Sequence, residues 1–259
     1  MLTEPTKLAV IGDWHANTRW ACNALKYAKD NGADAVLQVG DFGFWRPDDP
    51  DTQPHLDEIS ETAKALGIEV LWLPGNHEYW PGLPHDPGML PGRGKKPSLI
   101  NGNLLYLPPG YRWSWWGKNF MAVGGAFSID RFMRTEGKGY WLEETLTDED
   151  VEYASREPHG LDVIFSHDCP KGVDIPGIGP DSKPRGGASL WPPLMLLQAE
   201  EHRQRMKDIW DVHKPQRWIH GHYHVYHETW YGPTIFTGLD MDGTTPETNI
   251  MFLGPGDLK

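Results

Sequence analysis

The chain has few cysteines, no long hydrophobic run and a deficit of positive charge. Its 259 residues include two cysteines, Cys22 and Cys169, too few for a disulfide framework, which favours a reducing compartment. No apolar run approaches membrane length and the first residues lack the pattern of a cleaved leader, so we expect a cytoplasmic protein that does not bind membranes. The formal net charge of −12 argues against a stable complex with nucleic acid.

The first part of the chain alternates strand-like and helix-like segments. Short apolar runs occur at 7–12, 35–39 and 68–73. Between them, residues 18–31 and 56–66 carry apolar side chains at helical spacing, and each segment is followed by glycine. This β-α-β-α-β order predicts parallel strands joined by helical crossovers.

The rest of the chain is richer in strands. A capping-box pattern at Thr147–Asp150 predicts the start of a short helix, and a longer helix is expected over 194–213. We expect an α/β (α+β) fold in which two packed, mixed β-sheets are flanked by helices, as a single domain over residues 1–259. The further strands are expected at 104–107, 111–116, 120–123, 161–165, 216–219, 225–231, 234–237 and 249–253.

Five clusters of metal-binding side chains each follow a strand-like run. Ligands of open α/β sheets sit beyond the carboxyl ends of the strands, so the fold should bring the clusters to one edge. Each residue alone has an ordinary explanation, such as a turn or a cap, and the order of the five is the signal. The clusters are Asp13-Trp14-His15, Gly40-Asp41, Gly75-Asn76-His77-Glu78, Ser166-His167-Asp168 and Gly221-His222-Tyr223-His224.

The ligand types indicate two divalent ions. Carboxylate and amide oxygens suit hard ions and imidazole suits transition metals, so the mixture favours manganese, with iron, zinc or nickel as alternatives. Two ions about 3.5–4 Å apart can share a hydroxide and hold the oxygens of a phosphoryl group. One carboxylate must bridge them, and Asp41 lies between the other ligands in the sequence.

The five clusters resemble the motifs of the calcineurin-like metallophosphoesterase superfamily, in particular its small bacterial and phage members. The resemblance implies a four-layer sandwich and a catalytic role for Asp41, the bridging ligand, and for His77, a non-ligand that contacts the phosphate and helps to protonate the leaving oxygen. It assigns one ion to Asp13, His15, Asp41 and His224, and the other to Asp41, Asn76, His167 and His222.

The sequence departs from this family at the second motif. Many members have Gly-Asp-x-x-Asp-Arg, whereas here Phe44 replaces the second aspartate and the arginine is displaced to Arg46. Phosphate binding should then fall to cations in the loops near the metal edge. The candidates are Arg46, Arg131, Lys171 and Arg185, with Arg134 and Lys183 also in suitable loops, and the aromatic candidates for stacking on a base are Trp45, Tyr79, Trp80 and Trp191.

The resulting hypothesis is a phosphodiesterase acting on a small, nucleotide-like ester, with a cyclic nucleotide as one candidate. Alternatives are a metal-dependent nuclease, disfavoured by the net charge, and a phosphomonoesterase or phosphoprotein phosphatase, disfavoured by the altered second motif. A non-catalytic protein-binding scaffold is a further alternative, although no ligand is missing from the five motifs. The pattern makes no prediction of oligomeric state.

Overall fold

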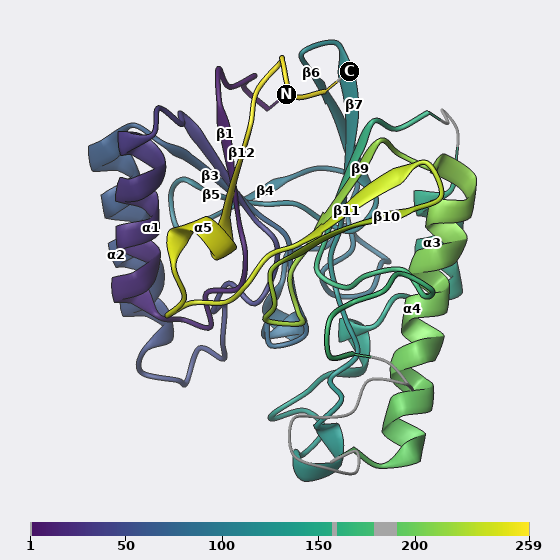
Figure 1. Cartoon of the computed structure of the whole chain (residues 1–259). Helices are drawn as coiled ribbons and strands as arrows, with labels where there is room; N and C mark the ends of the chain where they lie inside the picture. Colours follow the sequence, from purple (N-terminus) through teal and green to yellow (C-terminus); the bar gives the residue numbers. More distant parts are fainter. Residues whose placement is uncertain (1, 157–159, 179–190, 259) are drawn as a thin grey trace.

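A computed structural model describes residues 2–156, 160–178 and 191–258. Two mixed, six-stranded sheets pack face to face (Figure 1). Each sheet has four parallel strands with an antiparallel strand at either edge. The first sheet has the order β12 (Ile250–Leu253), β1 (Leu8–Ile11), β2 (Ala35–Gln38), β3 (Glu69–Trp72), β5 (Leu104–Tyr106) and β4 (Ser98–Ile100).

The second sheet repeats this arrangement. Its parallel strands are the middle four, and its two edge strands are antiparallel to their neighbours. The order is β10 (His227–Tyr231), β11 (Thr234–Gly238), β9 (Arg217–His220), β8 (Val163–Ser166), β7 (Lys118–Val123) and β6 (Tyr111–Trp115).

Helices cover the outer face of each sheet. On the first sheet lie α1 (Thr18–Asp30) and α2 (Thr52–Leu66), and on the second lie α3 (Asp148–Ala154) and α4 (Pro193–His213) (Figure 1). The expected helix–sheet–sheet–helix arrangement is therefore confirmed. The short elements are α5 (Pro246–Asn249) and the 3₁₀ turns η1 (Trp80–Gly82), η2 (Arg131–Met133) and η3 (Leu142–Glu144).

The strands read as continuous apolar runs because both of their faces are buried. In β1, Leu8 and Val10 belong to the core between the sheets, together with Phe120 of the second sheet. Ala9 and Ile11 point the other way and belong to the core beneath α1 and α2. This two-sided burial fixes the register of β1, since a slip of one residue would exchange its two faces.

The expected parallel order of the first three strands and the capping box at Thr147 are confirmed, and the strands expected at 111–116 and 120–123 pair as the hairpin of β6 and β7. The main differences are two element starts and one additional strand. The helix expected from Leu56 begins one turn earlier, at Thr52. Strand β10 begins at His227 rather than at residue 225, because Gly221 to Tyr226 form an irregular turn. Strand β4 was not expected, since its three residues pair as an edge strand and none of them is buried. No helix among the described residues is long and apolar enough to cross a membrane.

Candidate active site

The metal-binding clusters meet where strands of both sheets end. Asp13 follows β1, Asp41 follows β2 and Asn76 follows β3, whereas His167 and His222 follow β8 and β9 of the second sheet. Among the described residues, eight non-glycine residues have positive φ, and four of these are predicted ligands: His15, Asp41, His222 and His224, with φ from 44° to 70°. Such conformations cost free energy, and they concentrate at sites where a side chain must be aimed.

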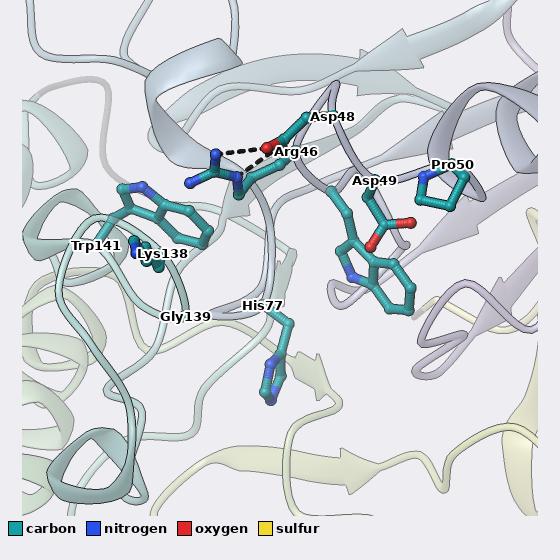
Figure 2. A pocket seen from close by; sticks show the side chains of 9 residues that line it. Arg46, Asp48, Asp49, Pro50, His77, Lys138, Gly139 and Trp141 are labelled. Atoms are coloured by element: carbon teal, nitrogen blue, oxygen red, sulfur yellow. Dashed lines mark hydrogen bonds and ion pairs between the residues drawn. The ribbon is translucent and has the colours of Figure 1, made fainter.

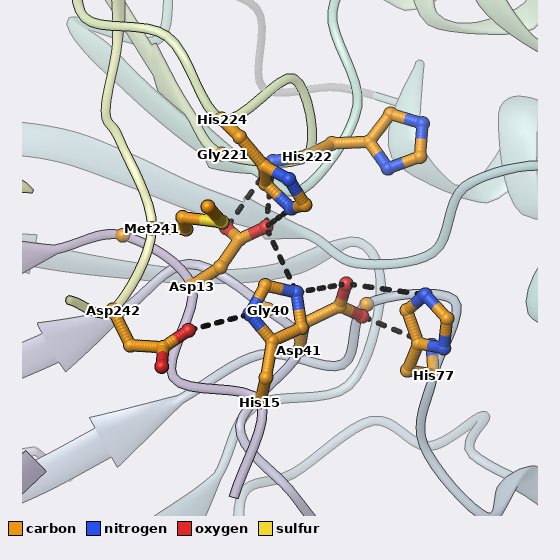
Figure 3. A network of polar contacts seen from close by, with 12 residues as sticks. Asp13, His15, Gly40, Asp41, His77, Gly221, His222, His224, Met241 and Asp242 are labelled. Atoms are coloured by element: carbon orange, nitrogen blue, oxygen red, sulfur yellow. Dashed lines mark hydrogen bonds and ion pairs between the residues drawn. The ribbon is translucent and has the colours of Figure 1, made fainter. Parts of the chain in front are cut away.

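Asp13, His15, Asp41 and His224 form the first donor set (Figure 3). One ligand atom from each lies within 4.8 Å of the others. His224 Nε2 is 3.1 Å from Asp13 Oδ2, and His15 Nε2 is 3.5 Å from Asp41 Oδ2. Two buried carboxylates and two imidazoles thus converge on a small volume, which is a suitable donor set for a divalent transition metal.

The second predicted set lies on the other side of Asp41. His167 Nε2 is 3.4 Å from Asp41 Oδ1 and 3.1 Å from Asn76 Oδ1. The rings of His167 and His222 lie with their centroids 5.0 Å apart. The two oxygens of Asp41 therefore face different donor sets, as a bridging carboxylate requires.

Hydrogen bonds on the far side of two imidazoles leave their Nε2 atoms available to the site. His167 Nδ1 lies 2.8 Å from the carbonyl oxygen of Val39, so Nδ1 donates its proton there and Nε2 faces the site. His15 Nδ1 makes the same kind of bond, 2.8 Å long, to Asp242 Oδ1. A carboxylate or carbonyl behind an imidazole is typical of metal-ligating histidines.

Two glycines of the motifs permit the close packing of these donors. A Cβ atom at Gly75 would collide with Asp41 Oδ1 and His167 Nε2, and one at Gly221 would collide with Asp13 Oδ1. Gly75 has no positive φ, so the requirement there is for space rather than for backbone freedom. The donor chemistry and this close approach both fit a pair of divalent ions.

The electrostatics of the site favour positive charge. Burial lowers the pKa of His15 and of His167, but the carboxylates of Asp41 and Asp13 outweigh it and raise both pKa values to about 10. Burial also opposes ionisation of Asp41, yet the neighbouring histidines hold its pKa well below the usual value. The site thus stabilises bound cations, protons included, at neutral pH.

His222 has a different environment. Burial lowers its pKa to about 4, so its imidazole is neutral near pH 7 and can bind a metal. Its backbone N–H donates to Asp13 Oδ1 and Oδ2, at 3.2 Å each, and this contact connects the β9 loop to the β1 loop.

The sequence profile of the calcineurin-like phosphoesterases matches residues 6–226. The chain belongs to this family. Family members use divalent metals to act on phosphate esters, in agreement with the donor sets described above. No curated protein matches the chain in sequence.

Solved structures share the phosphoesterase fold at low sequence identity. A dimetal phosphatase from Danio rerio has 13% identity and a TM-score of 0.54, and the alignment covers 96% of this chain and 92% of that one. TT1561 of Thermus thermophilus has 11% identity and a TM-score of 0.53, with 98% and 100% covered. A putative 5'-nucleotidase from Staphylococcus aureus has 12% identity and a TM-score of 0.52, and the alignment covers 96% of this chain but 52% of the other.

Glu78 of the phosphoesterase links the loops that carry the ligands. Its buried carboxylate accepts the backbone N–H groups of Asp41 at 3.2 Å, Gly43 at 3.1 Å and Gly75. Burial and the neighbouring Asp41 raise the pKa of Glu78 to about 7. Glu78 is the last residue of the third motif and can be located from the sequence. Its contacts, however, form only where two loops meet.

His77 lies between the predicted metal ligands and a pocket. Its Nε2 is 4.0 Å from Asp41 Oδ2, and its Nδ1 is 2.9 Å from Nη1 of Arg134. Burial lowers the pKa of His77, and the positive charge of Arg134 adds to this effect. The pocket has a volume of about 430 Å³ and is lined by Trp45, Arg46, Asp48, Asp49, Pro50, His77, Lys138, Gly139 and Trp141 (Figure 2).

The four predicted phosphate-binding cations occupy different places. Arg46 lines the pocket and makes two bonds, of 2.8 and 2.7 Å, to the carboxylate of Asp48. Arg131 is largely buried, and its Nη2 donates to Glu144 Oε1 at 2.6 Å. Lys171 is exposed and lies 3.9 Å from Glu200. Arg185, like Lys183, lies outside the described residues. Phosphate binding by these residues stays a prediction.

The aromatic candidates are corrected in part. Trp80 is fully buried and its indole N–H donates to the Gly75 carbonyl at 3.0 Å, so it packs beneath the site and cannot stack on a base. Tyr79 packs edge-to-face on Trp141. Trp191 lies against Phe132. Trp45 lines the pocket, so of the four it is best placed to meet a substrate.

Several residues around the predicted ligands were not assigned a role from the sequence. Asp242 binds His15 from the turn that follows β11. Asp168 follows His167 in the chain; its carboxylate accepts a hydrogen bond from Tyr223 Oη at 2.5 Å and contacts His202 Nδ1 at 2.6 Å. An aspartate next to a motif histidine was a usable signal for Asp168, whereas nothing in the sequence indicates that Asp242 reaches His15.

Proposed function

We propose that this phosphoesterase is a dinuclear-metal phosphodiesterase that hydrolyses small, nucleotide-like esters. The main support for a paired metal centre is Asp41, because its two carboxylate oxygens face two different donor sets. In this proposal the first ion is held by Asp13, His15, Asp41 and His224, and the second by Asp41, Asn76, His167 and His222.

Divalent ions supply Lewis-acid polarisation of the phosphoryl group and activation of water. Asp41 holds both donor sets in register, and Glu78 fixes the backbone on which Asp41 sits. His77 faces the same carboxylate from the pocket side, where it can donate a hydrogen bond to a phosphate oxygen. Manganese is the favoured metal, because the set mixes hard oxygens with imidazole nitrogens.

The pocket beside His77 is the observation that favours a nucleotide-like diester. Its volume of about 430 Å³ falls in the range of small-molecule sites, and it can accept a second ester group as large as a nucleoside. Trp45 and Trp141 give it aromatic walls. Its two cations, Arg46 and Lys138, are balanced by two acids, Asp48 and Asp49, so the pocket suits a weakly charged group rather than a nucleic-acid backbone.

The test is a substrate panel on protein stripped of metal and reloaded with manganese, iron, nickel or zinc. We expect bis-p-nitrophenyl phosphate and a cyclic nucleotide to be hydrolysed faster than p-nitrophenyl phosphate, with single- and double-stranded nucleic acids resistant. Turnover of the monoester alone would contradict the diesterase proposal, and degradation of DNA or RNA would indicate a nuclease.

Two variants test whether the measured turnover arises at this site and not from a contaminating enzyme. Asp41→Asn should abolish turnover, because it weakens both donor sets, whereas His77→Ala should lose most turnover and keep both metals. If His77→Ala is as active as the wild type on every substrate, the chain does not use this site for catalysis, and a protein-binding scaffold becomes the better interpretation.

A further inference from the structure

Arg134 makes an unusual contact for a residue next to a candidate catalytic histidine. It follows the turn η2, and its Nη1 lies 2.9 Å from Nδ1 of His77. The guanidinium is held on two other sides, by Asp130 Oδ2 at 2.5 Å and by the carbonyl oxygen of Gly139 at 3.1 Å. The guanidinium is therefore held in place by three partners, and its contact with His77 is not that of a freely moving side chain.

Hydrogen-bond chemistry decides which form of His77 this contact allows. A guanidinium has donors only, so the atom that it faces must be an acceptor. Nδ1 of His77 therefore carries the lone pair, and the single N–H of the ring lies at Nε2. An imidazolium would place a second N–H against the guanidinium and two positive charges in contact.

In this tautomer the N–H group at Nε2 faces the site. Nε2 lies 4.0 Å from Asp41 Oδ2, on the side of the metal ligands (Figure 3). His77 also lines the pocket and its side chain is 30% exposed, so a ligand that occupies the pocket can reach it. The N–H group is thus available at the place where the phosphoryl group of a substrate would lie.

We propose that Arg134 is a positioning residue for His77: its guanidinium occupies Nδ1, so that the N–H group at Nε2 faces the ligand side of the pocket and donates a hydrogen bond to a phosphate oxygen. This proposal rests on the proposed phosphoesterase function of the same site. In this arrangement His77 acts on the phosphate as a hydrogen-bond donor through Nε2. At the second motif, Phe44 occupies the position of the second aspartate in Gly-Asp-x-x-Asp-Arg.

The first test reads the tautomer directly by two-bond ¹H–¹⁵N correlation spectra of histidine-labelled, metal-free protein at pH 8. The signals of His77 are identified by their loss in His77→Gln. We expect an Nε2–H pattern in the wild type and a mixture of tautomers in Arg134→Met. An Nδ1–H or imidazolium pattern in the wild type, or an unchanged pattern in Arg134→Met, would overturn the proposal.

The second test is a double-mutant cycle on kcat, with whichever ester the substrate panel identifies. Arg134→Met should lower kcat about tenfold when His77 is present, and less than about twofold in the His77→Gln background, since residues that act through one another are not additive. Equal losses in both backgrounds would show that Arg134 acts on the substrate itself, and a loss confined to KM would do the same.

Two control variants complete the design. Arg134→Lys keeps an N–H donor and should retain kcat within about threefold. Arg156→Met removes another i,i+4 ion pair, with Glu152 on the surface, and should change neither the tautomer nor kcat. Because the spectra need no metal and no substrate, they test the arrangement of Arg134 and His77 even if the diesterase proposal fails.

Discussion

The imidazoles of His15 and His167 present Nε2 to the site because each Nδ1 is bound to a protein oxygen. For His167 that oxygen is the backbone carbonyl of Val39, which no substitution can remove. For His15 it is the carboxylate of Asp242, a side chain that can be changed. Asp242 also accepts a hydrogen bond from Nδ2 of Asn17 at 2.6 Å, so both of its oxygens are engaged.

We therefore expect Asp242→Asn to weaken the first metal site. The amide keeps the shape of the side chain, but it loses the negative charge and has one acceptor oxygen for two donors. Loss of such a partner typically costs about 10–100-fold in metal affinity. Chelator competition measures the affinities of the two ions separately, and Asp211→Asn, which removes an exposed carboxylate from α4, is the matched control. Equal weakening of both ions would contradict the assignment of His15 to one of them.

At the scale of single residues, the sequence predicted which side chains gather at the site better than it predicted their surroundings. The motifs name Asp13, Asp41 and the histidines, because a metal restricts the choice of residue type. Arginine carries no such restriction. Arg131 and Arg134 were both candidates for phosphate, yet one is paired with buried Glu144 and the other meets His77. That difference depends on how the loop around η2 is folded.

At the scale of elements, His55 connects three segments that surround the ligand loops. It lies in α2, its Nδ1 is 2.8 Å from the hydroxyl of Thr18 in α1, and its Nε2 is 3.0 Å from the carbonyl of Phe42 next to Asp41. The aromatic ring of Phe42 then stacks on Trp72 of β3. Burial lowers the pKa of His55 to about 4, from an ordinary value of 6.5.

This shift predicts a loss of stability in acid. Between pH 6.5 and 4 the unfolded chain binds a proton at His55 that the folded chain does not, so stability rises with pH in this window and is lost as the pH falls. From pH 7 to 5 the folded state should lose about 2 kcal/mol through His55, since one pKa unit corresponds to about 1.4 kcal/mol.

Urea unfolding of metal-free protein at pH 7 and pH 5 measures this loss. His55→Gln should remove about 2 kcal/mol of the pH dependence, whereas His85→Gln, at a position in a loop, should leave it unchanged. An identical pH dependence in the wild type and His55→Gln would show that His55 is not the titrating group.

Elements with strong periodicity were predicted well, and elements held by tertiary contacts were not. The parallel strands of the first sheet followed from their apolar runs, and α1 from its helical spacing. Strand β4 and helix α5 escaped prediction, since neither contains a buried apolar run. The hydrogen bonds that Glu78 accepts from Asp41 and Gly43 join two loops that no local pattern relates.

At the scale of the whole molecule, the proposed ligands come from both sheets. Asp13, His15, Asp41 and Asn76 extend from the first sheet, whereas His167, His222 and His224 extend from the second. The core between the sheets is apolar, and at its edge two buried carboxylates, Asp13 and Asp41, lie close together. Metal ions would join the two halves and neutralise these charges.

Metal removal should therefore lower the stability of the whole fold. An ion present at 100 times its dissociation constant adds about 2.7 kcal/mol to the free energy of unfolding when it binds only the folded state. We expect chemical denaturation of the wild type to shift by about this amount between manganese and EDTA, and that of Asp41→Asn to shift far less. A similar shift in both proteins would place the stabilising ions elsewhere.

The sequence by itself determined the residue types of the proposed metal ligands and the strands that precede them, because a metal-binding motif and two-sided burial each leave a local pattern. Only the tertiary structure decided that Asp242 reaches His15, that Arg134 meets His77 and that Trp80 is buried beneath the site. These contacts join segments up to 227 residues apart, as between His15 and Asp242. They depend on loop conformations, and these are set by which loops the two sheets bring side by side rather than by the composition of each loop.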